Sequence, residues 1–316
     1  MGGNEDRIME VAGRLLRDGE VDLIIGYERG TVPLRSTPCF AKDPEDIDKL
    51  IWDPTCDINL AKYLQGREER IGILAKGCDA RSIAVCASEG QVEMGKIVIL
   101  GLPCQGVINR KKIEAEMAGK EILDAIITDE NITVKGEGFE EELPTKEFLD
   151  DSCLSCRHRN PPVYDVLIGE PLPEVAQANE YAEVDELESR SAGERWAHFV
   201  EEIGDCIRCY SCRNVCPMCY CKECFVDETI PAWFGKTNDI TDTLIYHLVR
   251  AIHLTGRCVD CGACSRACPM DINLRALTKK AEKIARERFD FEAGLDPEET
   301  PVLGAFKQED SEEFII

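Results

Sequence analysis

The sequence has few aromatic residues, few histidines and little positive charge, and it contains no long apolar run. Aromatic side chains make up 6% of the residues, and there are four histidines. Asp and Glu number 61 against 37 Lys and Arg, which gives a formal net charge of −24. An acidic chain without a basic stripe is repelled by nucleic-acid phosphates and anionic lipids, so we expect neither as a partner.

The longest candidate for a membrane span is the apolar stretch 97–102. It is far shorter than the roughly 20 residues that a spanning helix needs. The first residues are acidic and lack the apolar core of a signal peptide. We therefore expect a cytoplasmic protein with no membrane attachment.

Cysteine, in contrast, is abundant, with 18 residues in a chain of 316. Disulfides are rare in the reducing cytoplasm. Ligation of a metal or of an iron–sulfur cluster is therefore the expected role of many of these thiols.

The order of apolar and polar segments predicts an α/β domain over residues 1–170. Short apolar runs at 21–27, 69–77 and 96–103 read as buried strands between helical segments, and residues 122–143 alternate as a β-hairpin. Residues 171–203 follow as a linker that becomes a helix, capped at Ser191 by an S-x-x-E box with Glu194. Residues 204–289 form a second, small α+β or helical domain, and 290–316 an acidic C-terminal tail.

Two copies of the motif C-x-x-C-x-x-C-x-x-x-C-P define the second domain. In two-cluster ferredoxins the first three cysteines hold one 4Fe–4S cluster, and the cysteine before proline ligates the other cluster. This predicts a cluster A on Cys206, Cys209, Cys212 and Cys268, and a cluster B on Cys258, Cys261, Cys264 and Cys216. The alternative is a pair of zinc sites, but a third cysteine at this spacing before C-P is not the usual zinc pattern. The region resembles the bacterial-type two-cluster ferredoxins.

Three further cysteines, Cys219, Cys221 and Cys224, follow the first motif without an assigned cluster. They are a candidate extra metal site if His247 or His253 supplies a fourth ligand. The alternative, which we favour, is that they are reduced structural thiols.

Residues 1–170 contain seven cysteines, of which four stand where a ligand could lie. Cys78 and Cys104 each follow an apolar strand, in the segments AKGCD and GLPCQG, and Cys153 and Cys156 form a C-x-x-C pair. Thiols at the carboxyl ends of neighbouring strands could together hold one 4Fe–4S cluster. Spacing alone leaves this open.

At these residues the chain resembles the beta subunits of deazaflavin-reducing hydrogenases and of related formate dehydrogenases. The resemblance rests on the opening GRLLRDGEVDLIIGY, on AKGCD and GLPCQG, and on the C-x-x-C pair followed by YDVLIGE. It implies that Cys78, Cys104, Cys153 and Cys156 bind a third cluster, cluster C. It also implies an FAD site, but the glycine-rich opening of the family is reduced here to Gly2 and Gly3 before acidic residues, which would repel a pyrophosphate. We expect the flavin site to be lost.

The sequence offers no catalytic acid–base pair and no nucleophile. We therefore expect an electron-transfer subunit that relays electrons between two partners, without turnover of its own. The resemblance suggests a catalytic subunit of formate dehydrogenase or hydrogenase type and a flavin-bearing protein of heterodisulfide-reductase type. The alternative is an FAD-containing beta subunit that itself reduces or oxidises a deazaflavin or nicotinamide coenzyme.

Overall fold

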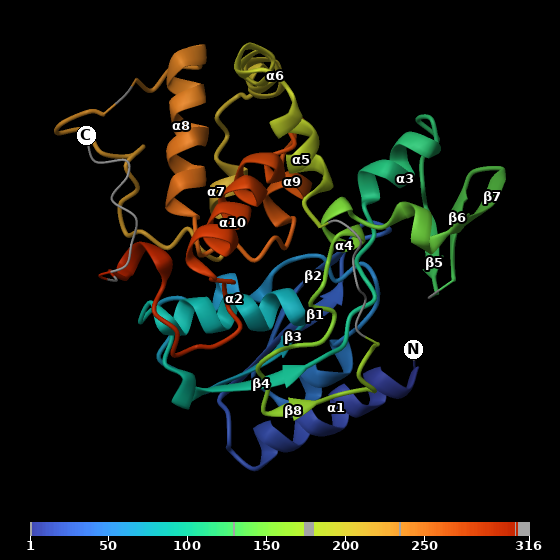
Figure 1. The fold of residues 1–316 in the computed structure, drawn as a ribbon. Coiled ribbons are helices and arrows are strands. Elements are labelled where there is room, and N and C mark those ends of the chain that lie inside the picture. The colour runs from blue at the N-terminus through green and yellow to red at the C-terminus, as the bar shows by residue number, and fades with distance from the viewer. Residues whose placement is uncertain (1, 129, 174–179, 234, 307, 309–316) are drawn as a thin grey trace.

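A five-stranded sheet organises the first half of the computed structural model, which describes residues 2–128, 130–173, 180–233, 235–306 and 308. Its strands are β1 (Leu23–Arg29), β2 (Ser36–Ala41), β3 (Ile71–Ala75), β4 (Ile97–Gly101) and β8 (Val166–Leu167). They lie in the order β2-β1-β3-β4-β8 (Figure 1). Strands β1, β3, β4 and β8 are parallel, and β2 is an antiparallel edge strand.

Helices cover both faces of this sheet, which explains why its central strands are apolar throughout. Helix α1 (Gly2–Arg17) and helix α2 (Gly77–Ser88) lie on opposite sides of it (Figure 1). All five residues of β3 are buried, as expected for a parallel strand packed on both faces. The expected α/β fold of this half is confirmed.

A smaller antiparallel sheet stands beside the main one. It contains β5 (Asp124–Ile127), β6 (Asn131–Gly136) and β7 (Phe139–Pro144), paired in that order. The hairpin expected over 122–143 is therefore a three-stranded meander. Helix α3 (Arg110–Glu116), a 3₁₀ turn at Thr145–Phe148 and helix α4 (Asp151–Leu154) connect these strands to the main sheet. Further 3₁₀ turns at Pro44–Lys49, Leu60–Tyr63 and Met94–Lys96 lie in the connections between strands of the main sheet.

The second half is helical in the part that the structure describes. Its helices are α5 (Ala182–Ser189), α6 (Ala192–Gly204), α7 (Ser211–Asn214), α8 (Ile240–His253), α9 (Ala263–Arg266) and α10 (Arg275–Phe289), with a 3₁₀ turn at Val302–Gly304. They lie over the α2 side of the sheet (Figure 1). Ser191 caps α6, and its main-chain N–H donates to Glu194 Oε2 at 2.8 Å, which confirms the predicted capping box.

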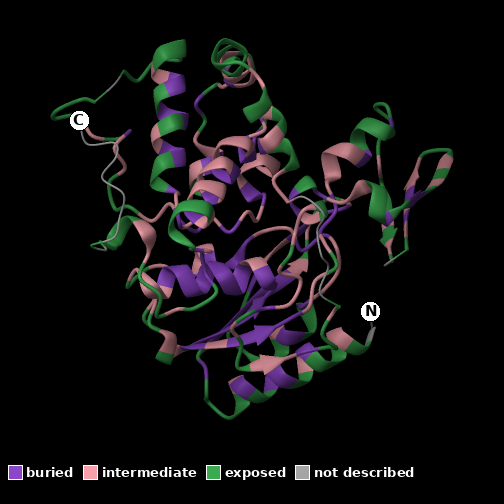
Figure 2. Ribbon diagram, viewed as in Figure 1, coloured by how far each residue is buried: buried purple, intermediate pink, exposed green. Residues whose placement is uncertain are grey.

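An apolar core joins the two halves. Val85 and Cys86 of α2 pack with residues in or beside the cysteine motifs, with the residue that ends α8, and with the segment after α10: Met218, Val259, Leu254, Phe291 and Ala293. Helix α2 is consequently buried around most of its circumference (Figure 2). The expected C-terminal tail therefore starts inside the protein, because Phe291 and Ala293 are buried. Residues 174–179 of the expected linker, and residues 307 and 309–316 of the expected tail, lie outside the described residues.

None of the described helices is both long enough and apolar enough to cross a membrane.

Candidate iron–sulfur sites

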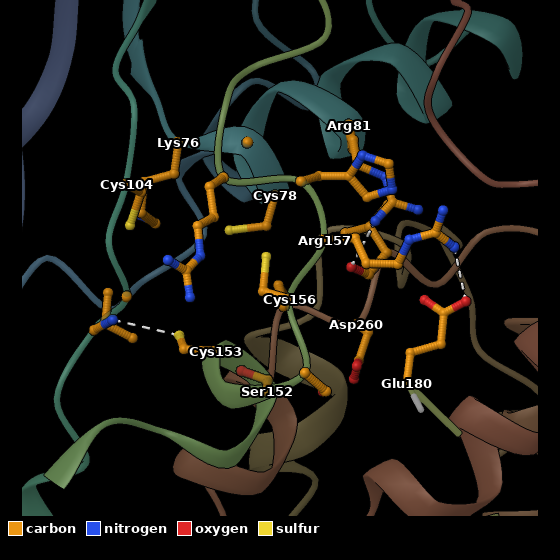
Figure 3. Close-up of a pocket in the computed structure, with 18 of the residues that line it drawn as sticks. Lys76, Cys78, Arg81, Cys104, Ser152, Cys153, Cys156, Arg157, Glu180 and Asp260 are labelled. Atoms are coloured by element: carbon orange, nitrogen blue, oxygen red, sulfur yellow. Dashed lines mark hydrogen bonds and ion pairs between the residues drawn. The ribbon is translucent and has the colours of Figure 1, made fainter. Parts of the chain in front are cut away.

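Four thiols of the first half line one cavity beneath the C-terminal helices. Cys78 lies in the first turn of α2, directly after β3, and Cys104 follows β4. Cys153 belongs to α4, and Cys156 follows it by three residues. All four line the same cavity, and Figure 3 shows their sulfur atoms grouped around it. Because β3 and β4 are parallel neighbours, their carboxyl ends bring Cys78 and Cys104 together as predicted.

Main-chain contacts hold the three cysteine-bearing segments against one another. The N–H of Cys104 donates to the carbonyl of Arg159 at 2.9 Å, and the N–H of Val107 donates to Cys153 Sγ at 3.3 Å. Gly77 lies so close to the 153–159 segment that a Cβ there would stand 1.9 Å from the carbonyl oxygen of His158. Only glycine therefore fits before Cys78.

Replacement of Gly77 by alanine should separate these segments. We expect a loss of about 3 kcal/mol of folding free energy, because a backbone carbonyl cannot yield as a flexible side chain can. The protein should also lose the iron bound by this cavity. Thermal unfolding and iron analysis of Gly77→Ala test this, with Gly95→Ala as control because no atom lies within 4 Å of that position. Equal behaviour of the two variants would contradict the close-approach argument.

The four thiols are strongly desolvated. Burial raises the pKa of Cys104 to about 12, with Cys153 the next contribution, and raises the pKa of Cys78 well above its ordinary value. Such thiols remain protonated unless a metal centre replaces the proton. Lys76 is buried beside them and pairs with Asp79 at 2.8 Å. Burial acts to lower the pKa of Lys76, but Asp79 and Cys78 outweigh it, so the lysine stays charged.

The two cysteine motifs of the second half adopt the same loop. Arg208 and Asp260, two residues after the first cysteine of each motif, both have positive φ, at 51° and 53°. Their N–H groups donate to Cys206 Sγ and to Cys258 Sγ, each at 3.4 Å. Each loop then enters a four-residue helix, α7 or α9. A positive φ at a non-glycine residue costs conformational free energy. Its occurrence at the same position of both motifs indicates that this position has the same role in each loop.

The fourth cysteine of each motif lies with the other motif. Burial raises the pKa of Cys206, and Cys212, Cys268 and Cys209 add to the effect. Burial likewise raises the pKa of Cys261 to about 12, and the next contribution is Cys216. Cys206, Cys212 and Cys268 thus pack in one apolar cluster, and Cys216, Cys258 and Cys261 pack in another, which agrees with the crossed arrangement. The two complete ligand sets stay predictions: Cys206, Cys209, Cys212 and Cys268 in one, and Cys258, Cys261, Cys264 and Cys216 in the other.

The three sets of thiols follow one another in space. Burial raises the pKa of Cys212, and one of the groups that add to it is Cys264 of the neighbouring set. Burial also raises the pKa of Cys78, to which Cys261 adds. The loop of the second motif packs directly on α4, where a Cβ on Gly262 would stand 2.4 Å from Ser152 Oγ. The cluster B thiols therefore lie between those of clusters A and C, and Cys209 of the A set is the exposed one among the twelve.

Helix α8 places three polar side chains against the cluster A thiols. Tyr246 Oη lies 3.5 Å from Cys212 Sγ, and His247 Nε2 lies 3.2 Å from Cys206 Sγ. Arg250 Nη2 donates to the carbonyl of Cys212 at 3.1 Å. Burial lowers the pKa of His247 to about 4, so the ring is neutral where it contacts the Cys206 sulfur through Nε2.

Sequence reasoning missed Tyr246 and Arg250 as site residues and treated His247 as structural or as a zinc ligand. The sequence offered no clear signal, because the buried face of α8 is largely polar while Ile245, Leu248 and Ile252 are exposed. Buried polar groups require partners, and here the partners are the cysteine loops.

Cys219, Cys221 and Cys224 line a separate pocket that Lys62, Arg213 and Arg250 also line. A hydrogen bond with Cys216 lowers the pKa of Cys219 to about 7, with Arg250 contributing. Throughout the described ranges, no three His, Cys, Asp or Glu side chains lie close enough to hold a single metal ion. An extra site on these three thiols therefore stays a prediction, without single-ion geometry to support it.

The charges near the thiols suit iron–sulfur clusters, which are anionic when ligated by four thiolates. Lys76 lies beside the first-half set, and Arg250 lies beside the second-half sets. The Nε atom of Arg250 is buried and has no hydrogen-bond partner among the described residues. The B and C sets thus combine buried thiols with buried positive charge, and the A set combines three more buried thiols and the exposed Cys209 with the same Arg250. Thiols beside positive charge are the donor chemistry that a cubane needs.

Comparison with known proteins gives two relatives that align along most of the chain. The F420-dependent formate dehydrogenase subunit beta of Methanocaldococcus jannaschii is 24% identical over 344 residues, which is 90% of each chain. The F420-dependent formate dehydrogenase 1 subunit beta of Methanococcus maripaludis is 26% identical over 356 residues, 92% of this chain and 90% of that one. No family model matches the sequence.

Among solved structures, a chain of the F420-reducing NiFe hydrogenase complex from Methanosarcina barkeri, studied by xenon derivatization, is 19% identical. The match covers 47% of this chain and 57% of that one, with a TM-score of 0.37, which is too low to bear on the fold. The resemblance seen in the sequence is confirmed by the two relatives: over nine tenths of its length, the chain is similar to the beta subunits of F420-dependent formate dehydrogenases.

Proposed function

We propose that this chain is an iron–sulfur relay subunit of a cytoplasmic redox complex. In this proposal it carries electrons between a catalytic subunit of formate dehydrogenase or hydrogenase type and a flavin-bearing partner of heterodisulfide-reductase type. Its relatives are beta subunits of formate dehydrogenases, which supports a role in an oxidoreductase complex. Residues 1–170 would hold one cluster, and residues 204–289 would form a two-cluster ferredoxin-like module.

The observation that carries the proposal is the succession of three four-thiol sets. Cluster C would lie on Cys78, Cys104, Cys153 and Cys156, cluster B on Cys258, Cys261, Cys264 and Cys216, and cluster A on Cys206, Cys209, Cys212 and Cys268. Cys261 of the B set lines the same cavity as the four thiols of the C set, and Cys264 of the B set adds to the raised pKa of Cys212 in the A set, which supports transfer from one set to the next. Bound 4Fe–4S clusters would supply one-electron transfer along this line.

The residues of the chain would hold and tune these centres. The backbone N–H groups of Val107, Arg208 and Asp260 donate to ligand sulfurs, which stabilises thiolates. Tyr246 and neutral His247 add side-chain contacts to the A set. Cys209 is exposed, so a partner could come closest to the clusters at the A set. Because electron transfer requires close approach, electrons would pass between this chain and the partner there.

Metal content tests the proposal directly. Twelve cysteines in three sets predict about twelve iron and about twelve acid-labile sulfide per chain in anaerobically purified protein. A value near eight would remove one cluster and retain the other two. A value near zero for iron, with stoichiometric zinc, would reject the relay.

A second candidate is favoured by the names of the relatives, which are F420-dependent enzymes. In this alternative the chain binds FAD and itself exchanges electrons with a deazaflavin or nicotinamide coenzyme. Acid precipitation of the purified protein distinguishes the two candidates. Release of stoichiometric flavin into the supernatant would favour the second, and a colourless supernatant would favour the relay.

A further inference from the structure

Arg250 is a buried cation that no acidic side chain neutralises within the part of the chain that the structure describes. It belongs to α8 and is 5% exposed. No carboxylate of the described chain lies within ion-pair distance of its guanidinium group, and its Nε has no hydrogen-bond partner. A buried charge without a counter-charge is strongly destabilising, so something else must balance it.

Other buried arginines in the same region are balanced in the ordinary way. Arg266 Nη1 lies 3.0 Å from Asp150 Oδ1, and Arg275 Nε lies 2.7 Å from Asp260 Oδ1. Arg250 therefore differs from its neighbours in lacking a carboxylate, although the chain carries an excess of acidic residues.

The groups that face Arg250 are thiols of both sets in the second half, together with Cys219, which belongs to neither set. Its Nη2 donates to the carbonyl of Cys212, and its side chain lines the pocket of Cys219. Burial acts to lower the pKa of Arg250, but Cys264, Cys216, Cys212 and Cys219 outweigh it. Cys212 belongs to the A set, whereas Cys264 and Cys216 belong to the B set. The guanidinium group thus stands between the two proposed clusters.

We propose that Arg250 is the shared counter-ion of clusters A and B and raises the reduction potential of both. The inference rests on the proposed function, since it requires that both clusters are present. A four-thiolate cubane is anionic and gains one further negative charge when it is reduced. A fixed positive charge in a poorly polarisable interior stabilises the reduced form more than the oxidised form. Loss of that charge should therefore make both clusters harder to reduce.

The experiment is an EPR-monitored redox titration of the full chain, purified anaerobically, as wild type and as Arg250→Gln, Arg250→Lys and Arg257→Gln. We expect Arg250→Gln to reduce the equilibrium constant for reduction of clusters A and B at least tenfold, which is a shift of about 59 mV to more negative potential. Arg250→Lys should restore most of that shift because it keeps the charge. Arg257→Gln is the matched control, since Arg257 follows the same helix but pairs with Glu89 at 2.5 Å.

Cluster C provides an internal reference, because its ligand thiols are not among the groups that Arg250 faces. Unchanged A and B potentials in Arg250→Gln, with iron content intact, would overturn the inference. Loss of both clusters in the Gln and Lys variants alike would also overturn it, because a retained charge should rescue an electrostatic role. Loss in the Gln variant alone, with near wild-type potentials in the Lys variant, would support it. If the wild-type protein itself lacks clusters A and B, the proposed function fails before Arg250 is tested.

Discussion

Replacement of Cys216 by alanine is expected to remove the cluster of the second motif, not the cluster of the motif to which Cys216 belongs. The reason is that the Cys216 thiol lies with Cys261 and Cys264. Iron content should fall from about twelve to about eight per chain, because a cubane that loses one of its four thiolates is no longer fully held. Cys39→Ala is the control, since Cys39 is buried in β2 outside all three sets.

Double substitutions identify which cluster is lost. Cys216→Ala combined with Cys258→Ala should still leave about eight iron, because both thiols serve cluster B. Cys216→Ala combined with Cys206→Ala should leave about four, because cluster A is lost as well. The reverse pattern, with about eight iron in the second double variant and about four in the first, would show that each motif completes its own cluster.

The isolated chain is expected to show no turnover with any of four donors: formate, hydrogen, NADH and reduced deazaflavin. The sequence contains no catalytic acid–base pair, and one-electron carriers act only through partners that perform the chemistry. The measurement is anaerobic reduction of a viologen dye by the purified, flavin-free chain. Activity should appear when a catalytic subunit of formate dehydrogenase or hydrogenase type is added.

A heat-inactivated catalytic subunit is the control for that assay, because it supplies the same protein mass without chemistry. Dye reduction by the pure chain with any of the four donors would contradict the relay and would favour a self-sufficient flavoenzyme. The flavin analysis proposed above would then identify the cofactor responsible.

The ligands of clusters A and B could be predicted from the sequence because they follow fixed local spacing, whereas the spacing of the first-half cysteines left cluster C open. The three leading cysteines of each motif lie within seven residues, so their loop geometry depends little on the rest of the fold. Cys78 and Cys104 could also be paired, since parallel neighbouring strands end at one edge of a sheet. In each case a short-range rule was sufficient.

The sequence could not predict the features that depend on packing between distant segments. Helix α2 went unrecognised because all but three of its twelve residues are buried, so it shows no amphipathic pattern. Strand β8 has only two residues. The role of Arg250 is visible only when α8 is seen against both cysteine loops, because an arginine in a helix ordinarily faces solvent.

Because α2 and the C-terminal segment share an apolar core, neither half of the chain can bury all of its apolar residues without the other. Met218, Val259 and Phe291 of the second half cover Val85 and Cys86, and these two residues in turn cover that part of the second half. A gene fragment that encoded either half alone would specify a protein with a large water-exposed apolar face, prone to aggregate. The C-terminal half is thus not a detachable module, and we expect the two halves to fold only when they are expressed as one chain.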